Sequence, residues 1–62
     1  MVNKEFIVTG QLQESDGQTL ILHGSFFETS REQAIEKFHK HFEPNLKVLK
    51  IYSVVNEQGQ LV

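Results

Sequence analysis

Two segments of alternating apolar and polar residues, separated by a short loop with a glycine, restrict the fold of this chain more than any other feature of its sequence. Residues 4–13 and 18–28 place an apolar side chain or a glycine at every second position, which is the period of a half-buried β-strand. The loop between them contains Gly17, and glycine adopts the left-handed backbone conformation of tight hairpins without steric cost. The sequence therefore predicts a β-hairpin.

Two hairpin geometries compete for this loop. A two-residue turn would pair Ser15 with Gln18. A three-residue loop, with Gly17 in the left-handed conformation, would instead pair Glu14 with Gln18. A shift of one residue moves every side chain to the other face, so the apolar pattern decides between the two registers. The three-residue loop gives one coherent apolar face, with the pairs Leu12–Leu20, Gly10–Leu22, Val8–Gly24 and Phe6–Phe26. We therefore predict the three-residue loop.

A helix is predicted directly after the hairpin. Ser30 is a favourable N-cap, and Gln33 lies three residues later, where it can complete a capping box. The apolar residues that follow have helical spacing and form one stripe: Ala34, Ile35, Phe38 and Phe42. The helix is expected to end near Glu43, because the proline that follows disfavours helical backbone in that residue. The stripe is expected to pack on the sheet.

A third strand is predicted over residues 46–56, with a short strand over 60–62. In the third strand, we expect Leu49, Ile51 and Val55 to face the helix. The opposite face would carry Val48, Lys50, Tyr52 and Val54. The segment before residue 60 has Gly59 in the same loop place as the glycine of the first hairpin.

These elements define an α+β fold of ββαβ order in one domain, residues 1–62. Placing the third strand beside the first gives a three-stranded antiparallel sheet of order 2-1-3. The helix then crosses one face, and a short fourth strand lies at the C-terminus. Gly10 would lie on the helix side of the central strand, where the missing side chain lets the helix approach closely.

Composition limits the classes of function. A chain of 62 residues buries a small core, and a partner chain often completes domains of this size. The absence of cysteine fits a reducing compartment, and no apolar run is long enough for a signal peptide or a membrane span. We therefore expect a cytoplasmic protein with no membrane association. The net charge of −2 disfavours general binding to nucleic acids.

Catalytic and metal-binding patterns are missing from the sequence. No serine lies in a nucleophile elbow, and no glycine-rich loop precedes the helix to hold a phosphate. His39 and His41 are two residues apart on a helix, so their side chains would project about 200° apart. We therefore expect no enzyme, no catalytic residues, no metal site and no cofactor.

The sheet face away from the helix is the candidate site. One helix cannot cover both faces of the sheet, and exposed apolar residues that lie together suggest an interface. The candidate residues are Ile7, Ile21, His23, Phe27, Lys50 and Tyr52. We expect a non-enzymatic protein-binding module that acts through this face or through an edge strand, with a protein partner or a second copy. The alternative is binding of RNA or single-stranded DNA on the same face, where aromatic side chains beside a lysine could stack bases.

Two families show a resemblance to this sequence. Phe6-x-Val8-x-Gly10, the helix start from Ser30 through Lys37 and Leu49-x-Ile51 resemble the archaeal LX-type ribosomal proteins of the large subunit. This resemblance covers most of the chain and implies binding to ribosomal RNA. The size, the acidic charge, the strand order and the helix opening Glu32-Gln33-Ala34 resemble small phage proteins that take over host machinery, such as inhibitors of the host RNA polymerase. That resemblance implies a phage or prophage protein that binds a host protein.

Overall fold

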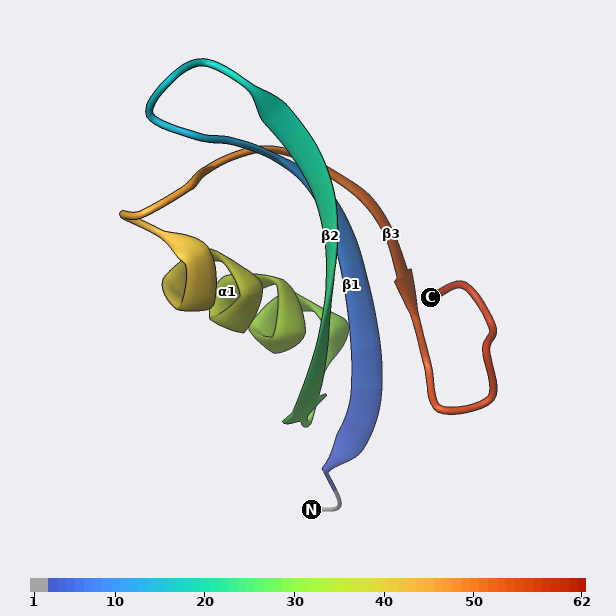
Figure 1. Ribbon diagram of the computed structural model, residues 1–62. Helices are drawn as coiled ribbons and strands as arrows, with labels where there is room; N and C mark the ends of the chain where they lie inside the picture. Colours follow the sequence, from blue (N-terminus) through green and yellow to red (C-terminus); the bar gives the residue numbers. More distant parts are fainter. Residues whose placement is uncertain (1–2) are drawn as a thin grey trace.

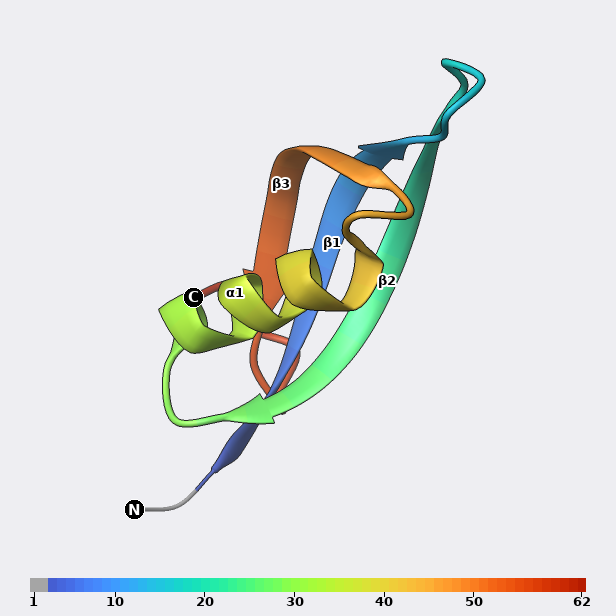
Figure 2. The same ribbon diagram turned by 90° about the vertical axis from the view of Figure 1, so that its left-hand side faces the viewer.

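The computed structural model describes residues 3–62, which form a three-stranded sheet with one helix across it (Figure 1). The elements follow one another as β1 (Lys4–Gln13), β2 (Thr19–Glu28), α1 (Arg31–Phe42) and β3 (Lys47–Val55). The antiparallel sheet has the order β2-β1-β3, so the predicted fold class and strand order are confirmed. The strands curve around α1, which covers the inner face of the sheet (Figure 2).

The hairpin has the predicted three-residue loop. The amide of Glu14 donates to the carbonyl of Gln18 over 2.8 Å, and the amide of Gly17 donates to the carbonyl of Glu14 over 2.9 Å. Gly17 has φ +93°, the left-handed conformation that glycine adopts without steric cost. The four predicted pairs are confirmed: Leu12–Leu20, Gly10–Leu22, Val8–Gly24 and Phe6–Phe26.

The helix begins and ends where the sequence predicts. The amide of Gln33 donates to the side chain of Ser30 over 3.3 Å, so the N-cap is confirmed. The side chain of Gln33 accepts hydrogen bonds from the amide and the hydroxyl of Thr29, which is one residue further back than in a standard capping box. Glu43 is the C-cap, in extended backbone before Pro44.

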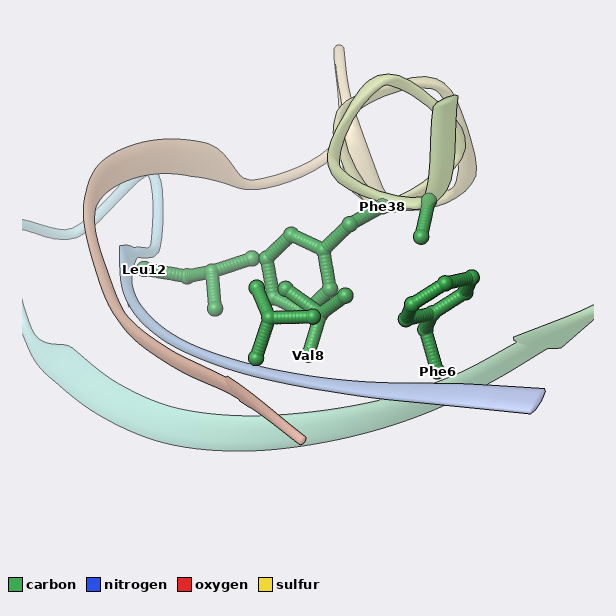
Figure 3. Packing of buried hydrophobic residues seen from close by; sticks show 6 residues of the cluster. Phe6, Val8, Leu12 and Phe38 are labelled. Carbon is green, nitrogen blue, oxygen red and sulfur yellow. The ribbon is translucent and has the colours of Figure 1, made fainter. Parts of the chain in front are cut away.

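The core lies between α1 and the inner face of the sheet, and its buried members come from three elements. They are Phe6, Val8 and Leu12 of β1, Ala34 and Phe38 of α1 and Val54 of β3. Figure 3 shows the β1 side chains of Phe6, Val8 and Leu12 directed toward Phe38. A Cβ atom added at Gly10 would lie 3.0 Å from the ring of Phe38, so this glycine does allow the close helix approach.

The third strand corrects our prediction, because it contains two irregularities. Leu12 pairs with Val48 and Gln11 with Lys50, which leaves Leu49 as an extra residue. Gly10 pairs with Ile51 and Thr9 with Ser53, which leaves Tyr52 as a second extra residue. Each β-bulge shifts the alternation of side chains by one position.

The two bulges reverse four of the predicted orientations in β3. Val48 and Val54 pack against the core, although we expected both on the outer face. Leu49 is exposed rather than turned toward the helix, and Val55 lies beside Ile7, which faces outward. Only Ile51 packs inward as predicted. The core residues of this strand therefore recur every three positions, so that Lys50 stays in solvent.

The C-terminal residues fold back along β3. The amide of Asn56 donates to the carbonyl of Gln60 over 2.9 Å, and Gly59 has φ +78°, so this turn repeats the geometry of the first hairpin. Leu61 forms a single antiparallel bridge with Val55. The predicted fourth strand is therefore present as one bridge.

Candidate functional site

All six candidate residues lie on the outer side of the sheet, and they come from all three strands. Ile7 belongs to β1, while Ile21, His23 and Phe27 belong to β2. On β1 and β2, these side chains alternate with the residues that face the helix. Lys50 and Tyr52 belong to β3, where Lys50 is paired with the outward residue Gln11. The Nζ atom of Lys50 lies 5.4 Å from the centre of the Tyr52 ring, in cation–π contact.

The directly opposed neighbours of the apolar candidates are mostly polar. Ile21 lies opposite Gln11, and Phe27 lies opposite Glu5, so each has a polar neighbour on the central strand. Ile7 is half-buried and lies between Ser25 of β2 and the apolar Val55 of β3. Ile21 therefore has only a polar neighbour across the ladder, whereas Ile7 has an apolar one.

Polar side chains join β1 to β2 between these apolar residues. The hydroxyl of Thr9 lies 2.8 Å from Nδ1 of His23, within hydrogen-bonding distance. The hydroxyl of Ser25 donates to a carboxylate oxygen of Glu5 over 2.7 Å. Four of the outward positions are therefore occupied by hydrogen-bonded pairs, which separates Ile21 from Phe27 along β2.

The aromatic candidates are also separated. Phe27 is at the end of β2 next to Glu5, whereas Tyr52 is on β3, beyond the central strand. Neighbouring strands are about 4.8 Å apart, and each residue advances about 3.3 Å along a strand. Tyr52 lies next to Ser53, which pairs with Thr9, whereas Phe27 pairs with Glu5, four residues earlier on β1. Tyr52 and Phe27 are therefore two strand spacings apart across the sheet and about four residues apart along it. The two rings therefore do not form one stacking platform.

The two outer edges of the sheet are very different. The edge of β3 has the bulges at Leu49 and Tyr52, and the end of the chain covers part of it. The amide of Val62 donates to the carbonyl of Val54 over 3.0 Å, and Arg31 donates from Nε to the carbonyl of Val62 over 2.9 Å. Bulges and covering segments are devices that prevent a sheet edge from pairing with another chain.

The edge of β2 has none of these devices. Its pairing with β1 runs without a shift from Thr19 to Glu28, and within residues 3–62 no strand lies on its other side. It contains no lysine and no proline, the residues that commonly protect an edge. Its most exposed apolar side chains are those of Ile21, at 55%, and Phe27, at 64%.

The hairpin loop determines which backbone groups this edge presents. Glu14 and Gln18 form a bonded pair, and in an antiparallel ladder bonded and non-bonded pairs alternate. The amide and carbonyl groups of every second residue after Gln18 therefore point away from β1. These residues are Thr19, Ile21, His23, Ser25 and Phe27. Three of them are predicted candidates, Ile21, His23 and Phe27, and the sequence-based prediction of an edge strand left open which of the two edges would serve.

The described residues offer little space for a small molecule. One half-open depression lies between the end of β2 and the start of α1, lined by Glu28, Gln33, Glu36 and Lys37, with a volume of about 160 Å³. Sites for small molecules usually exceed about 300 Å³. Residues 3–62 contain no group of three or more histidine or acidic side chains that could share a metal ion.

Comparison of the chain with models of protein families, with curated proteins and with solved structures found no match. Both resemblances that the sequence suggests therefore stay predictions. In the part of the chain that the structure describes, no helix is both long enough and apolar enough to cross a membrane.

Proposed function

We propose that this chain is a small non-enzymatic protein-binding module, and that it binds by adding an extended segment of its partner to the outer edge of β2. The observation that carries this proposal is the contrast between the two edges of one sheet. The β3 edge is bulged and partly covered, whereas β2 pairs over ten residues without a bulge, and among residues 3–62 no strand lies along its outer edge. An open edge of this length is a template for another strand.

In strand addition, the backbone and the side chains have different roles. Main-chain hydrogen bonds to the outward amide and carbonyl groups of β2 supply affinity, and alternate side chains of the added strand supply specificity. On the outer side, the new strand would lie beside Ile21 and Phe27. On the inner side, it would lie beside Leu22 and Phe26, which are half-buried at the border of the core. A partner segment with apolar side chains on both faces fits this edge best.

Ser25→Pro is the variant that tests strand addition. The amide of Ser25 points away from β1, so proline removes an outward donor and leaves the hairpin ladder complete. The preceding residue is Gly24, which tolerates the backbone restriction that proline imposes on its neighbour. Ser25→Ala is the matched control, because it loses the same hydroxyl bond to Glu5 but keeps the amide.

The measurement is affinity capture followed by reconstitution. The wild-type chain and Ser25→Ala are expected to retain one partner from a lysate of the source cells, either another protein or a second copy of this chain, and Ser25→Pro is expected to lose it. The partner, purified separately, should then shift the amide resonances of residues 19–27 on titration. Equal binding by Ser25→Pro, with its circular dichroism unchanged, would rule out the β2 edge as the binding site.

We further propose a phage or prophage origin and a cytoplasmic location. Acidity, small size and an unprotected edge together suit a protein that engages a host protein inside the cell. The neighbouring genes test this origin. An early-gene cluster of a phage supports it, whereas a ribosomal operon would favour the resemblance to ribosomal proteins.

Binding of RNA or single-stranded DNA is the second candidate function, and the contact between Lys50 and Tyr52 is the observation that favours it. A cation beside an exposed ring could contact a phosphate while the ring stacks on a base. This function predicts binding at low salt that weakens as salt increases and weakens with Lys50→Ala. Lys40→Ala, on the helix, is the control. Absence of binding at low salt by electrophoretic mobility shift would eliminate the candidate.

A further inference from the structure

The apolar residues of β2 are arranged symmetrically about Gly24. Three residues before this glycine stands Ile21, and three residues after it stands Phe27, the two most exposed apolar side chains of the strand. Two residues before and after it stand Leu22 and Phe26, which both face the core side. This arrangement suits a two-fold symmetric interface, because residues equally far from the axis before and after Gly24 oppose each other there, and each contact occurs twice with the roles exchanged.

We propose that the partner of the β2 edge is a second copy of this chain, joined by antiparallel pairing of the two β2 strands with Gly24 at the two-fold axis. This inference rests on the proposed function, because it names the segment that occupies the edge described above. Residues 20–28 of each copy take part in the ladder. The outward amide and carbonyl groups of Ile21, His23, Ser25 and Phe27 then find partners in the second copy.

Both faces of the joined sheet fit this register. On the outer face, Ile21 lies directly opposite Phe27 of the second copy, so each of the two most exposed apolar side chains of β2 gains an apolar neighbour. On the inner face, Leu22 lies opposite Phe26 of the second copy, which extends the two cores toward each other. At the centre, the two Gly24 residues face each other, and their lack of side chains leaves room for the Phe26 rings that lie over them.

Neighbouring registers are worse. With His23 at the axis, the two His23 side chains would face each other, and Ile21 would lie opposite Ser25. With Leu22 at the axis, Ile21 would lie opposite His23, and Phe27 would lie beyond the ladder. The register centred on Gly24 also opposes no two like charges, because Glu28, the only charged residue of β2, lies opposite Leu20.

Because the two edges of the sheet differ, we expect the assembly to stop at two copies. Each chain has one open edge, which the second copy occupies. Its other edge is protected by the two β-bulges and by the C-terminal residues. The product is therefore a dimer with one continuous sheet, in the order β3-β1-β2-β2-β1-β3, and with both helices on the same face. A chain with two open edges would form longer assemblies instead.

Isotope-filtered nuclear magnetic resonance of a mixture of labelled and unlabelled chains tests this register. Within one chain, six residues separate Ile21 from Phe27 along a strand, a distance of about 20 Å at 3.3 Å per residue. A nuclear Overhauser effect between the Ile21 methyl groups and the Phe27 ring can therefore arise only between copies. We expect this signal, together with the mass of a dimer in sedimentation. A dimer that shows Ile21 next to Ser25 or His23 instead would overturn the register.

A pair of lysine variants tests the edge. Ile21→Lys and Leu49→Lys each place a positive charge at an exposed aliphatic residue, at opposite edges of the sheet, where the wild-type side chains are 55% and 43% exposed. We expect Ile21→Lys to raise the dissociation constant of the dimer at least about tenfold, since the change occurs twice in each dimer. Leu49→Lys should leave the dissociation constant unchanged. Circular dichroism confirms that both variants are folded.

The outcomes separate this inference from the proposed function. A wild-type chain that stays monomeric at the concentrations used for magnetic resonance would overturn the dimer, while capture of another protein that Ser25→Pro abolishes would still support the binding edge. A dimer that both Ile21→Lys and Ser25→Pro leave intact would overturn the β2–β2 pairing, and the capture experiment with Ser25→Pro would then decide the binding edge by itself. A dimer that both variants disrupt, with the Ile21–Phe27 signal, supports both.

Discussion

The two outer strands of this sheet pair with the same central strand, yet they differ in regularity. β2 follows β1 without a shift over ten residues and leaves its outer edge open. β3 has two bulges and is partly covered by the residues that follow it. In β2, core-facing residues therefore recur at every second position. In β3, the core-facing residues recur at every third position, which keeps Lys50 in solvent. A regular strand is easy to predict and easy for another chain to pair with, and an irregular strand is neither.

Substitution of two apolar residues of β3, one buried and one exposed, gives the largest expected difference. Val54 is 1% exposed in the core, whereas Leu49 is the extra residue of a bulge and is 43% exposed. We expect Val54→Ala to lower the free energy of unfolding by about 2–3 kcal/mol, through lost burial and the cavity that remains. Leu49→Ala should cost less than about 1 kcal/mol. Chemical denaturation measures both.

The reverse order of these two effects would show that β3 has the regular alternation that we predicted from the sequence. That alternation places Leu49 toward the helix and Val54 in solvent. The bulges would then be absent in solution, and the argument that they protect this edge would fail with them.

The hairpin, the helix with its N-cap and the strand order could be predicted because each follows from local signals. Gly17 determines the loop, and the apolar pattern then determines the register. The two-residue alternation of a regular strand could not predict which residues of β3 face the helix. The two bulges interrupt that alternation, and neither contains a glycine that would mark it in the sequence. One signal was present. Val48, Ile51 and Val54 are spaced by three, and a regular strand with Val48 and Val54 inside would also bury Lys50.

The candidate face was predicted only in part, for the same reason. Its six residues do lie on the outer side, but Val48 and Val54, which would have joined them into one patch, pack inward. The predicted register already places Thr9 opposite His23, whereas the bond of Ser25 runs diagonally to Glu5 and depends on side-chain conformation, which the pattern does not give. Topology leaves both β2 and β3 with a neighbour on one side only, and the bulges and covering residues of β3, which the sequence pattern did not reveal, decide that the open edge is β2.

Alanine substitution of two turn glycines compares the two edges directly. Gly17 and Gly59 have φ of +93° and +78°, and neither has an atom near the place of an added Cβ, so only backbone strain acts in both variants. Gly17→Ala should cost about 1–2 kcal/mol, because the strained residue cannot be released without opening the β1–β2 ladder. Gly59→Ala should cost less than about 1 kcal/mol, because the C-terminal residues can detach locally.

Denaturation of both variants, with hydrogen exchange of the strand amides, checks this comparison. Gly59→Ala should speed the exchange of the Val62 amide, which donates to Val54, and should leave the hairpin amides protected. Equal losses of stability for the two variants would mean that the covering segment is as firmly attached as the hairpin itself.

Removal of residues 60–62 should have a smaller effect on stability and a visible effect on association. The truncation removes the bonds of Val62 to Val54 and Arg31 and those between Gln60 and Asn56, all in an exposed segment whose ordering entropy offsets much of their gain, so the expected loss of stability is about 1 kcal/mol. It also opens the end of the β3 edge. Light scattering should then detect species larger than the dimer. If the mass distribution is unchanged, the bulges at Leu49 and Tyr52 are sufficient protection by themselves.

Ser25→Ala is expected to have the smallest effect, and it separates the side chains of the β2 edge from its backbone. The hydroxyl of Ser25 donates to Glu5 at an exposed position, so its loss should cost no more than about 0.5–1 kcal/mol. Association should not change, because the amide that pairs with a neighbouring strand is still present. Thermal denaturation and sedimentation measure the two quantities. A loss of association with Ser25→Ala as large as with Ser25→Pro would assign recognition to the polar side chains of the outer face rather than to the open edge.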